Sequence, residues 1–257
     1  MALLAVNNLT KVFGGLSAVS NFNIELHPGE LVGLIGPNGA GKTTVFNLLT
    51  GVYEPTEGTI QFNNESIVGL KPYEITQRGM ARTFQNIRLF SNLSVLDNVR
   101  IAYHTHVKYG LTSAVMRLGN YFKEEEEMTR KAIEFLHIFN LDRKKDEIAK
   151  NLPYGEQRRL EIARALAAKP KLLLLDEPAA GMNPQETHEL MNLIKWIRDE
   201  FKLTILLIEH DMSLVMGACE RIYVLEYGMI IAHGTPEEIK SNPRVIEAYL
   251  GEEVAHA

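Results

Sequence analysis

One segment near the N-terminus constrains the fold of this chain more than any other. Residues 36–43 read GPNGAGKT and satisfy the pattern GxxxxGK[ST]. The segment follows an apolar run, Leu31–Ile35, and precedes a helix-like run, Thr44–Leu49. A strand, a glycine-rich turn and a helix in this order are the context in which the pattern binds nucleotide phosphates. The sequence therefore predicts an α/β fold built around a phosphate-binding loop.

The residue types of this loop indicate how it would work. Glycines let backbone N–H groups close round phosphates without Cβ clashes, and the helix N-terminus adds the positive end of a dipole. Lys42 can reach the β- and γ-phosphate oxygens, and the Thr43 hydroxyl can ligate Mg²⁺. The candidate nucleotide-binding residues of the loop are Gly36, Asn38, Gly39, Ala40, Gly41, Lys42, Thr43 and Thr44.

Short apolar runs bounded by Gly, Pro or Asn are typical of strands, and the longer segments between them indicate helices, so the predicted class is α/β. The runs Leu31–Ile35, Lys171–Leu175 and Thr204–Ile208 suit strands of a parallel sheet that is covered on both faces. Gly58 and Gly228 each suggest a hairpin, and hence some antiparallel sheet near each end. The other predicted strands are Leu4–Leu9, Phe22–Leu26, Thr59–Phe62, Ile222–Leu225 and Met229–Ala232.

The middle of the chain differs from both ends. Residues 86–151 lack strand-like runs and are richer in charge. Apolar residues recur there at helical spacing, namely Met128, Ala132, Phe135 or Leu136, and Phe139. We interpret the acidic run Glu124–Glu127 as a solvated helix face. We therefore expect a nucleotide-binding core over 1–85 and 152–257, with a helical subdomain inserted at 86–151.

Carboxylates and a histidine follow two of the buried strands. In a P-loop fold the acidic residue at such a strand end completes the Mg²⁺ shell, and Asp176 fits that position. Glu177 is next along the chain and can polarise the attacking water as general base. Parallel strands bring their C-terminal ends to one sheet edge, so His210, after Thr204–Ile208, is expected beside the γ-phosphate.

Composition and net charge limit the partners and the cell compartment that this chain can have. The formal net charge of −5 argues against a broad nucleic-acid-binding surface. No run approaches the roughly 18–20 apolar residues of a membrane span, and the N-terminus lacks a signal-peptide pattern. Cys219 is the single cysteine, which excludes an intrachain disulfide and a cysteine zinc site. We expect a cytoplasmic chain that can still dock on a membrane protein.

The phosphate-binding loop, the strand ending in Asp176 and Glu177, and His210, flanking a helical insert, resemble the ATP-binding-cassette (ABC) ATPase family over essentially the whole chain. The resemblance implies a mostly parallel core sheet, an antiparallel β subdomain, an inserted α-helical subdomain, and ATP and Mg²⁺ as cofactors. By the same resemblance, Phe13 would stack on adenine. Gln85 would be the Q-loop glutamine, which contacts Mg²⁺ and the attacking water.

Residues 152–157, which read LPYGEQ, stand where this family has its LSGGQ signature. In the family two cassettes face head to tail, and the signature of one closes over the nucleotide of the other. Gly155 matches the pattern, whereas Pro153 replaces the serine and Tyr154 the first glycine. Asn183 stands where the D-loop aspartate is usual. From these departures we expect this chain to pair with a different cassette in an asymmetric dimer.

Within the family, the string Gly79–Phe90 and the string Ala179–Pro184 resemble the larger ATPase subunit of branched-chain amino acid importers, as does Gly234–Ile239. This implies an ATPase that energises a membrane importer from the cytoplasmic face of the membrane, peripherally bound to permease subunits. An extracytoplasmic solute-binding protein would be an indirect partner. Residues Asn86–Leu96 would edge the groove for a short permease helix. Their apolar members Ile87, Leu89 and Phe90 suit such a contact, and local core packing is the alternative role for them.

Three other classes of P-loop protein are alternatives to an importer ATPase. The ATPase of an ABC exporter or lipid-extraction system remains an alternative. A soluble ABC ATPase acting on nucleic acid or ribosomes usually carries long coiled coils or two cassettes, and this chain has one cassette and no sustained heptads. A P-loop GTPase would need a base-reading Asn-Lys-x-Asp loop, and the sequence contains none.

Overall fold

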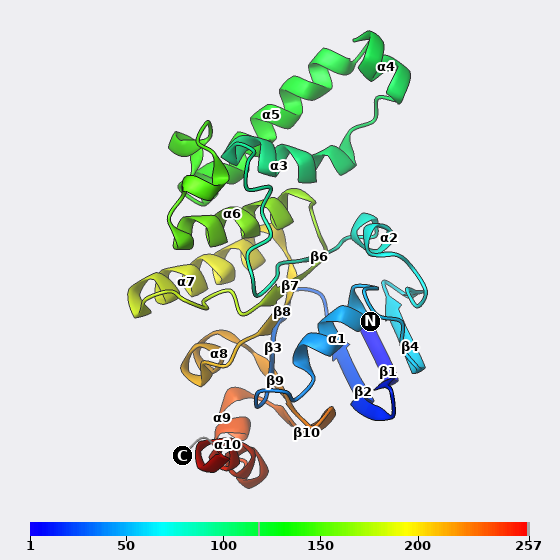
Figure 1. The fold of residues 1–257 in the computed structure, drawn as a ribbon, viewed down its shortest axis with the longest axis vertical. Coiled ribbons are helices and arrows are strands. Elements are labelled where there is room, and N and C mark those ends of the chain that lie inside the picture. The colour runs from blue at the N-terminus through cyan, green and yellow to red at the C-terminus, as the bar shows by residue number, and fades with distance from the viewer. Residues whose placement is uncertain (118, 256–257) are drawn as a thin grey trace. The chain divides into compact units, whose positions relative to one another are not determined.

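The computed structural model describes residues 1–117 and 119–255 and divides the chain into two compact units (Figure 1). The first unit comprises Met1–Arg82 and Lys171–Ala257, and the second Thr83–Pro170. The second unit is therefore larger than the predicted insert at 86–151. It includes helix α6 (Tyr154–Ala167), which packs on α3 (Val95–Tyr103) and α5 (Tyr121–Ile138). The signature residues thus belong with the inserted helices.

A six-stranded sheet forms the centre of the first unit, in the order β10-β9-β3-β8-β7-β6. All neighbouring strands are parallel except the β9–β10 pair, which confirms the predicted mostly parallel sheet. The strands β3, β7 and β8 are buried along their whole length. The strand bounds are β3 (Leu31–Ile35), β6 (Met80–Arg82), β7 (Leu172–Asp176), β8 (Thr204–Ile208), β9 (Arg221–Glu226) and β10 (Met229–Gly234).

A second, four-stranded sheet is antiparallel throughout, in the order β2-β1-β4-β5. Its strands are β1 (Leu4–Phe13), β2 (Leu16–Leu26), β4 (Glu57–Phe62) and β5 (Glu65–Ser66). The hairpin predicted at Gly228 is confirmed, since it joins β9 to β10.

The hairpin predicted at Gly58 is wrong. Gly58 lies inside β4, which pairs with β1, and the turn after β4 is made by Asn63 and Asn64 at φ 51° and 65°. The positive φ of Gly58 (95°) marks close strand approach instead, because a Cβ there would lie 2.5 Å from the Asn8 carbonyl oxygen. The pairing of β1 with β4 shifts register at this point.

Helices of the first unit bury apolar faces in the core around the sheets. Phe46 and Leu49 of α1, together with Val45, join Leu34 and Leu206 in one hydrophobic cluster. Gly33 in β3 lets the helix that carries Val215 approach the strand closely, because a Cβ on Gly33 would lie 2.8 Å from Val215 Cγ1. The helices of this unit are α1 (Lys42–Leu49), α2 (Pro72–Gln77), α7 (Pro184–Phe201), α8 (Met212–Ala218), α9 (Pro236–Lys240) and α10 (Pro243–Ala255).

The second unit is helical, as the sequence predicts. The apolar positions at helical spacing, Met128, Ala132 and Phe139, are all buried. Besides α3, α5 and α6 it contains α4 (Leu111–Met116) and 3₁₀ turns at His104–His106, Asp142–Lys144 and Ala149–Asn151. Across the described residues of both units, every helix is too short or too polar to span a membrane.

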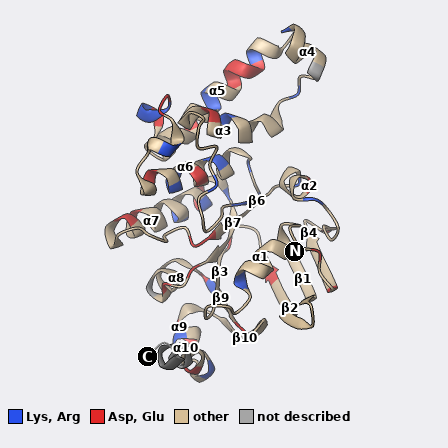
Figure 2. Cartoon of the chain, viewed as in Figure 1, with Lys and Arg blue, Asp and Glu red and all other residues tan. Residues whose placement is uncertain are grey.

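Acidic and basic residues both occur along α5 (Figure 2), and two carboxylates of its acidic run make contacts with neighbouring segments. Glu124 Oε2 accepts hydrogen bonds from the N–H groups of Lys108 (2.7 Å) and Tyr109 (3.3 Å). Glu125 pairs with Arg100 at 2.6 Å and accepts from the Tyr109 hydroxyl at 2.5 Å. The hydrogen bond to Glu125 is the main cause that raises the pKa of Tyr109 to about 12. These two carboxylates therefore fasten the segment before α4 and the helix α3 to α5, and for them the solvated-face prediction is wrong.

Candidate functional site

The phosphate-binding loop leaves β3 at Gly36 and enters α1 after Gly41. Gly36 has φ 149° and Gly41 has φ 105°, a region that L side chains rarely adopt. A Cβ on Gly36 would lie 2.0 Å from the Leu225 carbonyl oxygen, and one on Gly41 would lie 2.6 Å from that of Ala18. Strands β9 and β2 thus press against the loop backbone, and only glycine fits at these positions.

Lys42 points back into the loop. Its ammonium donates hydrogen bonds to the carbonyl oxygens of Gly36 (2.5 Å) and Pro37 (2.9 Å), and the residue is 8% exposed. The first backbone hydrogen bond of α1 runs from the Val45 N–H to the Gly41 carbonyl oxygen. The N–H groups before Val45 therefore take no part in the hydrogen bonds within the helix. Phosphate oxygens can replace these carbonyls as acceptors of the ammonium, and Thr43 is exposed beside it.

Asp176 ends β7 and is almost fully buried. Its Oδ2 lies 2.8 Å from Nη2 of Arg82, and the two side chains are 3% and 6% exposed. Sequence reasoning missed Arg82, because the strand β6 that ends with it has only three residues. The one available signal was an arginine directly before the predicted Q-loop.

Glu177 and His210 are brought together by the register of β7 with β8. His210 Nδ1 lies 3.6 Å from Glu177 Oε2, with the histidine side chain 60% exposed and the glutamate 15%. Glu177 has φ 46°, and its N–H donates to the Ile208 carbonyl oxygen at 2.9 Å. A left-handed non-glycine residue costs about 1–2 kcal/mol, which the surrounding bonds offset. This conformation gives Glu177 a direction different from that of Asp176.

Glu209, between β8 and His210, is a further buried carboxyl that sequence reasoning missed. It is 1% exposed, and its Oε1 accepts the Ala179 N–H at 2.9 Å. Burial raises the pKa of Glu209, although the Ala179 hydrogen bond acts in the opposite direction. The bond ties the segment after Glu177 to the end of β8.

Replacing Glu209 by Ala is expected to lower the free energy of unfolding by about 1–3 kcal/mol, because the buried Ala179 N–H loses its acceptor. Below a pH of about 4.3, the usual pKa of a glutamate in an unfolded chain, the raised pKa of Glu209 contributes its whole stabilising effect to the folded state. This contribution is lost as pH rises through the pKa of Glu209 in the folded protein. The stability of wild type relative to Glu209→Gln should therefore fall as pH rises above about 4.3. Chemical denaturation of the three proteins across pH tests this, and parallel pH curves for wild type and Glu209→Gln would contradict it.

Phe13, at the end of β1, is 41% exposed and forms an edge-on pair with Tyr53, with ring centroids 5.2 Å apart. Lys11 Nζ lies 5.0 Å from the centre of the Phe13 ring. Tyr53, itself 37% exposed, was not singled out from sequence. An exposed aromatic pair in the same unit as the phosphate-binding loop can accept the flat face of a base.

Gln85 and Gly155 lie in the second unit, and their placement at a nucleotide remains a prediction. Arg158 joins the two segments that carry them, since it donates to the carbonyl oxygens of Phe84 and Gln85, both at 2.6 Å. Arg158 is 0% exposed and pairs with Glu161 at 2.9 Å. Glu161 Oε1 in turn accepts the Arg88 N–H at 3.0 Å. The predicted Q-loop backbone and the helix behind the signature are thus fastened together.

The departures in the signature and D-loop have local structural roles. Pro153 is the N-cap of α6, and Tyr154 begins the helix with 45% exposure. Asn183 caps α7, where its Oδ1 accepts the Glu186 N–H at 2.9 Å. Asn and Asp are about equally good N-caps, so the D-loop asparagine keeps the fold that an aspartate would support.

Two of the three predicted metal residues, Thr43 and Asp176, carry oxygen donors suited to Mg²⁺, and the third, Gln85, lies in the second unit. The Thr43 hydroxyl and the Asp176 carboxylate are hard oxygen donors of the kind Mg²⁺ prefers when it binds together with phosphates. Both belong to the first unit, at the start of α1 and at the end of β7. The donor set therefore fits Mg²⁺.

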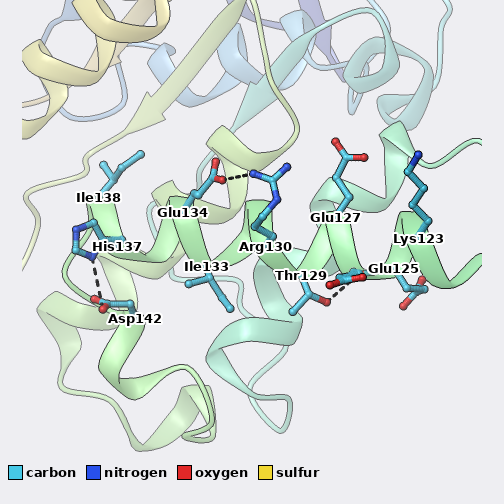
Figure 3. A pocket seen from close by; sticks show the side chains of 11 residues that line it. Lys123, Glu125, Glu127, Thr129, Arg130, Ile133, Glu134, His137, Ile138 and Asp142 are labelled. Atoms are coloured by element: carbon cyan, nitrogen blue, oxygen red, sulfur yellow. Dashed lines mark hydrogen bonds and ion pairs between the residues drawn. The ribbon is translucent and has the colours of Figure 1, made fainter.

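A separate hollow of about 1190 Å³ follows α5 of the second unit (Figure 3). Polar side chains along its lining contact one another, as Arg130 does Glu134 (2.6 Å) and His137 does Asp142 (3.5 Å). The residues of the predicted nucleotide site do not line it. We assign this hollow no part in nucleotide binding.

Comparisons with known proteins match this geometry. The sequence model of the ABC transporter family matches residues 19–180, and that of the branched-chain amino acid ATP-binding cassette transporter matches residues 229–255. The chain is 51% identical to the high-affinity branched-chain amino acid transport ATP-binding protein LivG of Escherichia coli K12, over 97% of this chain and 98% of LivG. It is 36% identical to the lipopolysaccharide export system ATP-binding protein LptB of the same strain, over 98% and 99% of the two chains.

Two solved structures of ATP-binding cassettes share the fold of this chain. The ADP conformation of MJ1267, an ATP-binding cassette of an ABC transporter, superposes with a TM-score of 0.85 at 33% identity, covering 98% of this chain and 99% of that one. A nucleotide-free ATP-binding cassette from an ABC transporter gives a TM-score of 0.84 at 34% identity, with 97% and 99% covered.

Proposed function

The chain belongs to the ABC transporter family as an ATP-binding cassette, and from this premise we propose that it hydrolyses ATP to energise a membrane importer of branched-chain amino acids. The observation that carries the proposal is the shared sheet edge of the first unit. There β3, β8 and β7 are parallel neighbours, and their C-terminal ends lead into Gly36, His210 and Asp176 with Glu177.

The residues at this edge divide the chemistry among them. The loop backbone and Lys42 bind the phosphates, and the Phe13–Tyr53 pair receives the adenine. Glu177 accepts a proton from the attacking water, and His210, in contact with Glu177, orients that water toward the γ-phosphate. Thr43 and Asp176 would hold Mg²⁺, whose positive charge would offset the negative charge of the phosphates.

The sequence relatives of this chain support branched-chain amino acids as the transported solute. LivG and the high-affinity branched-chain amino acid transport ATP-binding protein BraF of Pseudomonas aeruginosa are 51% and 46% identical to this chain over almost its full length. The lipopolysaccharide export relative stands at 36%. The C-terminal match over residues 229–255 is to a branched-chain amino acid cassette. These findings favour import of branched-chain amino acids over the exporter alternative.

The proposed partners are permease subunits at the cytoplasmic face of the membrane and a second, different cassette. An LSGGQ serine offers a hydroxyl to the γ-phosphate of the opposing nucleotide, and Pro153 has none. A chain that lends a weakened signature while keeping an intact phosphate-binding loop suits an asymmetric dimer. A solute-binding protein would act through the permease.

A tagged pull-down from detergent-solubilised native membranes, with partners identified by mass, tests the assembly. We expect permease chains and a second cassette of different mass. A single permease with two copies of this chain would contradict the asymmetric dimer. Recovery of the intact chain without any membrane protein would contradict the transport function.

A further inference from the structure

The Mg²⁺ ligand proposed above, Asp176, already has a cation beside it. Arg82 Nη2 lies 2.8 Å from Asp176 Oδ2, and both side chains are more than nine-tenths buried. Arg82 closes β6, and Asp176 closes the neighbouring parallel strand β7. A buried carboxylate is costly unless a cation and hydrogen bonds offset its charge, and Arg82 supplies both.

The same guanidinium is fixed by α1, the helix that begins with Lys42 and Thr43. Arg82 Nη1 donates to Asn47 Oδ1 at 2.7 Å and lies 3.4 Å from Thr50 Oγ1. The guanidinium carbon also lies 5.3 Å from the centre of the Phe46 ring. Neutral acceptors and an aromatic ring thus hold Arg82 from one side, while Asp176 is its acidic partner on the other.

We propose that Arg82 is a positioning residue that serves as the internal counter-ion of Asp176 and competes with Mg²⁺ for this carboxylate. The inference rests on the proposed ATP and Mg²⁺ site. Arg82 orients the carboxylate before the metal arrives. Because a positive charge beside a ligand disfavours a divalent cation, Arg82 also lowers the affinity of the site for Mg²⁺.

The test compares wild type with Arg82→Gln and Arg82→Lys. Each protein is held with a non-hydrolysable ATP analogue in EDTA, and Mg²⁺ is then titrated while the midpoint of thermal unfolding is followed. Arg82→Gln should have a lower midpoint in EDTA, and its half-saturating Mg²⁺ concentration should be at least about tenfold lower than that of wild type. Arg82→Lys keeps the charge but not the planar fork. It should lose thermal stability while its half-saturating Mg²⁺ concentration stays within about threefold of wild type.

The matched control is Asn47→Ala, which removes a neutral partner of the same guanidinium and keeps the ion pair. It should leave the half-saturating Mg²⁺ concentration within about twofold of wild type. An Arg82→Gln value equal to or above the wild-type value would overturn the counter-ion role and leave the ATP site standing. A wild-type midpoint that responds to nucleotide but not to Mg²⁺ would instead contradict the proposed metal site.

If Arg82→Gln fails to fold, wild type still decides the question. In protein labelled with ¹⁵N-arginine, the Arg82 Nε–H signal is assigned by its loss in Arg82→Lys. This signal should shift when Mg²⁺ is added to the nucleotide complex. A signal that stays in place while the unfolding midpoint rises with Mg²⁺ would overturn the proposal.

Discussion

Replacing Glu177 by Gln should leave ATP binding within about twofold of wild type while slowing hydrolysis at least about 10²-fold, the usual size of a general-base effect. The amide has the shape of the carboxylate but cannot accept a proton from water. The backbone geometry should survive, because the left-handed turn at Glu177 is held by its own N–H bonded to Ile208. The effect should therefore fall on the chemical step alone.

Single-turnover hydrolysis, measured on the assembly recovered with its membrane partners, separates this step from binding and product release. The matched control is Glu200→Gln, which neutralises an exposed carboxylate on α7 and should hydrolyse ATP at the wild-type rate. Near-normal turnover by Glu177→Gln would remove Glu177 from the role of general base. Loss of ATP binding along with turnover would indicate a structural role instead.

The parts of the site that could be predicted from sequence are those with a local signature. Gly36, Lys42 and Thr43 belong to a motif whose spacing is set by the phosphate, and Glu177 and His210 directly follow continuously apolar strands. Parallel pairing then brings these strand ends to one edge. The structure places Glu177 and His210 3.6 Å apart, as that reasoning requires.

Arg82 and Glu209 could not be found this way, because their roles depend on partners far along the chain. Arg82 pairs with Asp176 of the neighbouring strand, and its own strand β6, with three residues, is too short to be recognised from sequence. Glu209 looks like an ordinary charged residue after a strand until its Oε1 is seen on the Ala179 N–H. Buried polar partners of this kind are set by tertiary packing rather than by local pattern.

The differences between the predicted and the observed fold have the same origin. A glycine at position 58 predicts a turn from sequence. In the structure this glycine is required because the backbone of Asn8 lies too close for a Cβ. The helix α6 follows the predicted insert at 86–151 in the sequence, and it packs on α3 and α5. Apolar periodicity shows that a helix has a buried face but not which neighbour covers that face.

Replacing Arg158 by Met should destabilise the second unit by about 3–5 kcal/mol, the cost of breaking a fully buried ion pair from one side. The substitution leaves Glu161, 1% exposed, as a buried carboxylate without its cation. It also leaves the carbonyl oxygens of Phe84 and Gln85 without the guanidinium that binds them.

The double replacement Arg158→Met with Glu161→Met should recover part of this loss, because no unpaired charge then remains buried. Recovery should be incomplete, because Glu161 also accepts the Arg88 N–H, and a buried donor without an acceptor costs about 1–3 kcal/mol. Denaturant unfolding of the single and double variants gives the coupling free energy between the two residues.

The control for charge alone is Arg130→Met on α5, whose ion pair with Glu134 joins side chains that are 59% and 47% exposed. An exposed pair of this kind contributes about 0.3–0.5 kcal/mol, so this variant should unfold almost as wild type does. A similar small loss for Arg158→Met would mean that the buried pair does not fasten the Q-loop to α6. Hydrogen exchange distinguishes the cases further. If Arg158 holds the Q-loop to α6 through its bonds to Phe84 and Gln85, protection should fall at residues 84–88 and in the first turns of α6, and it should persist in the strands of the first unit.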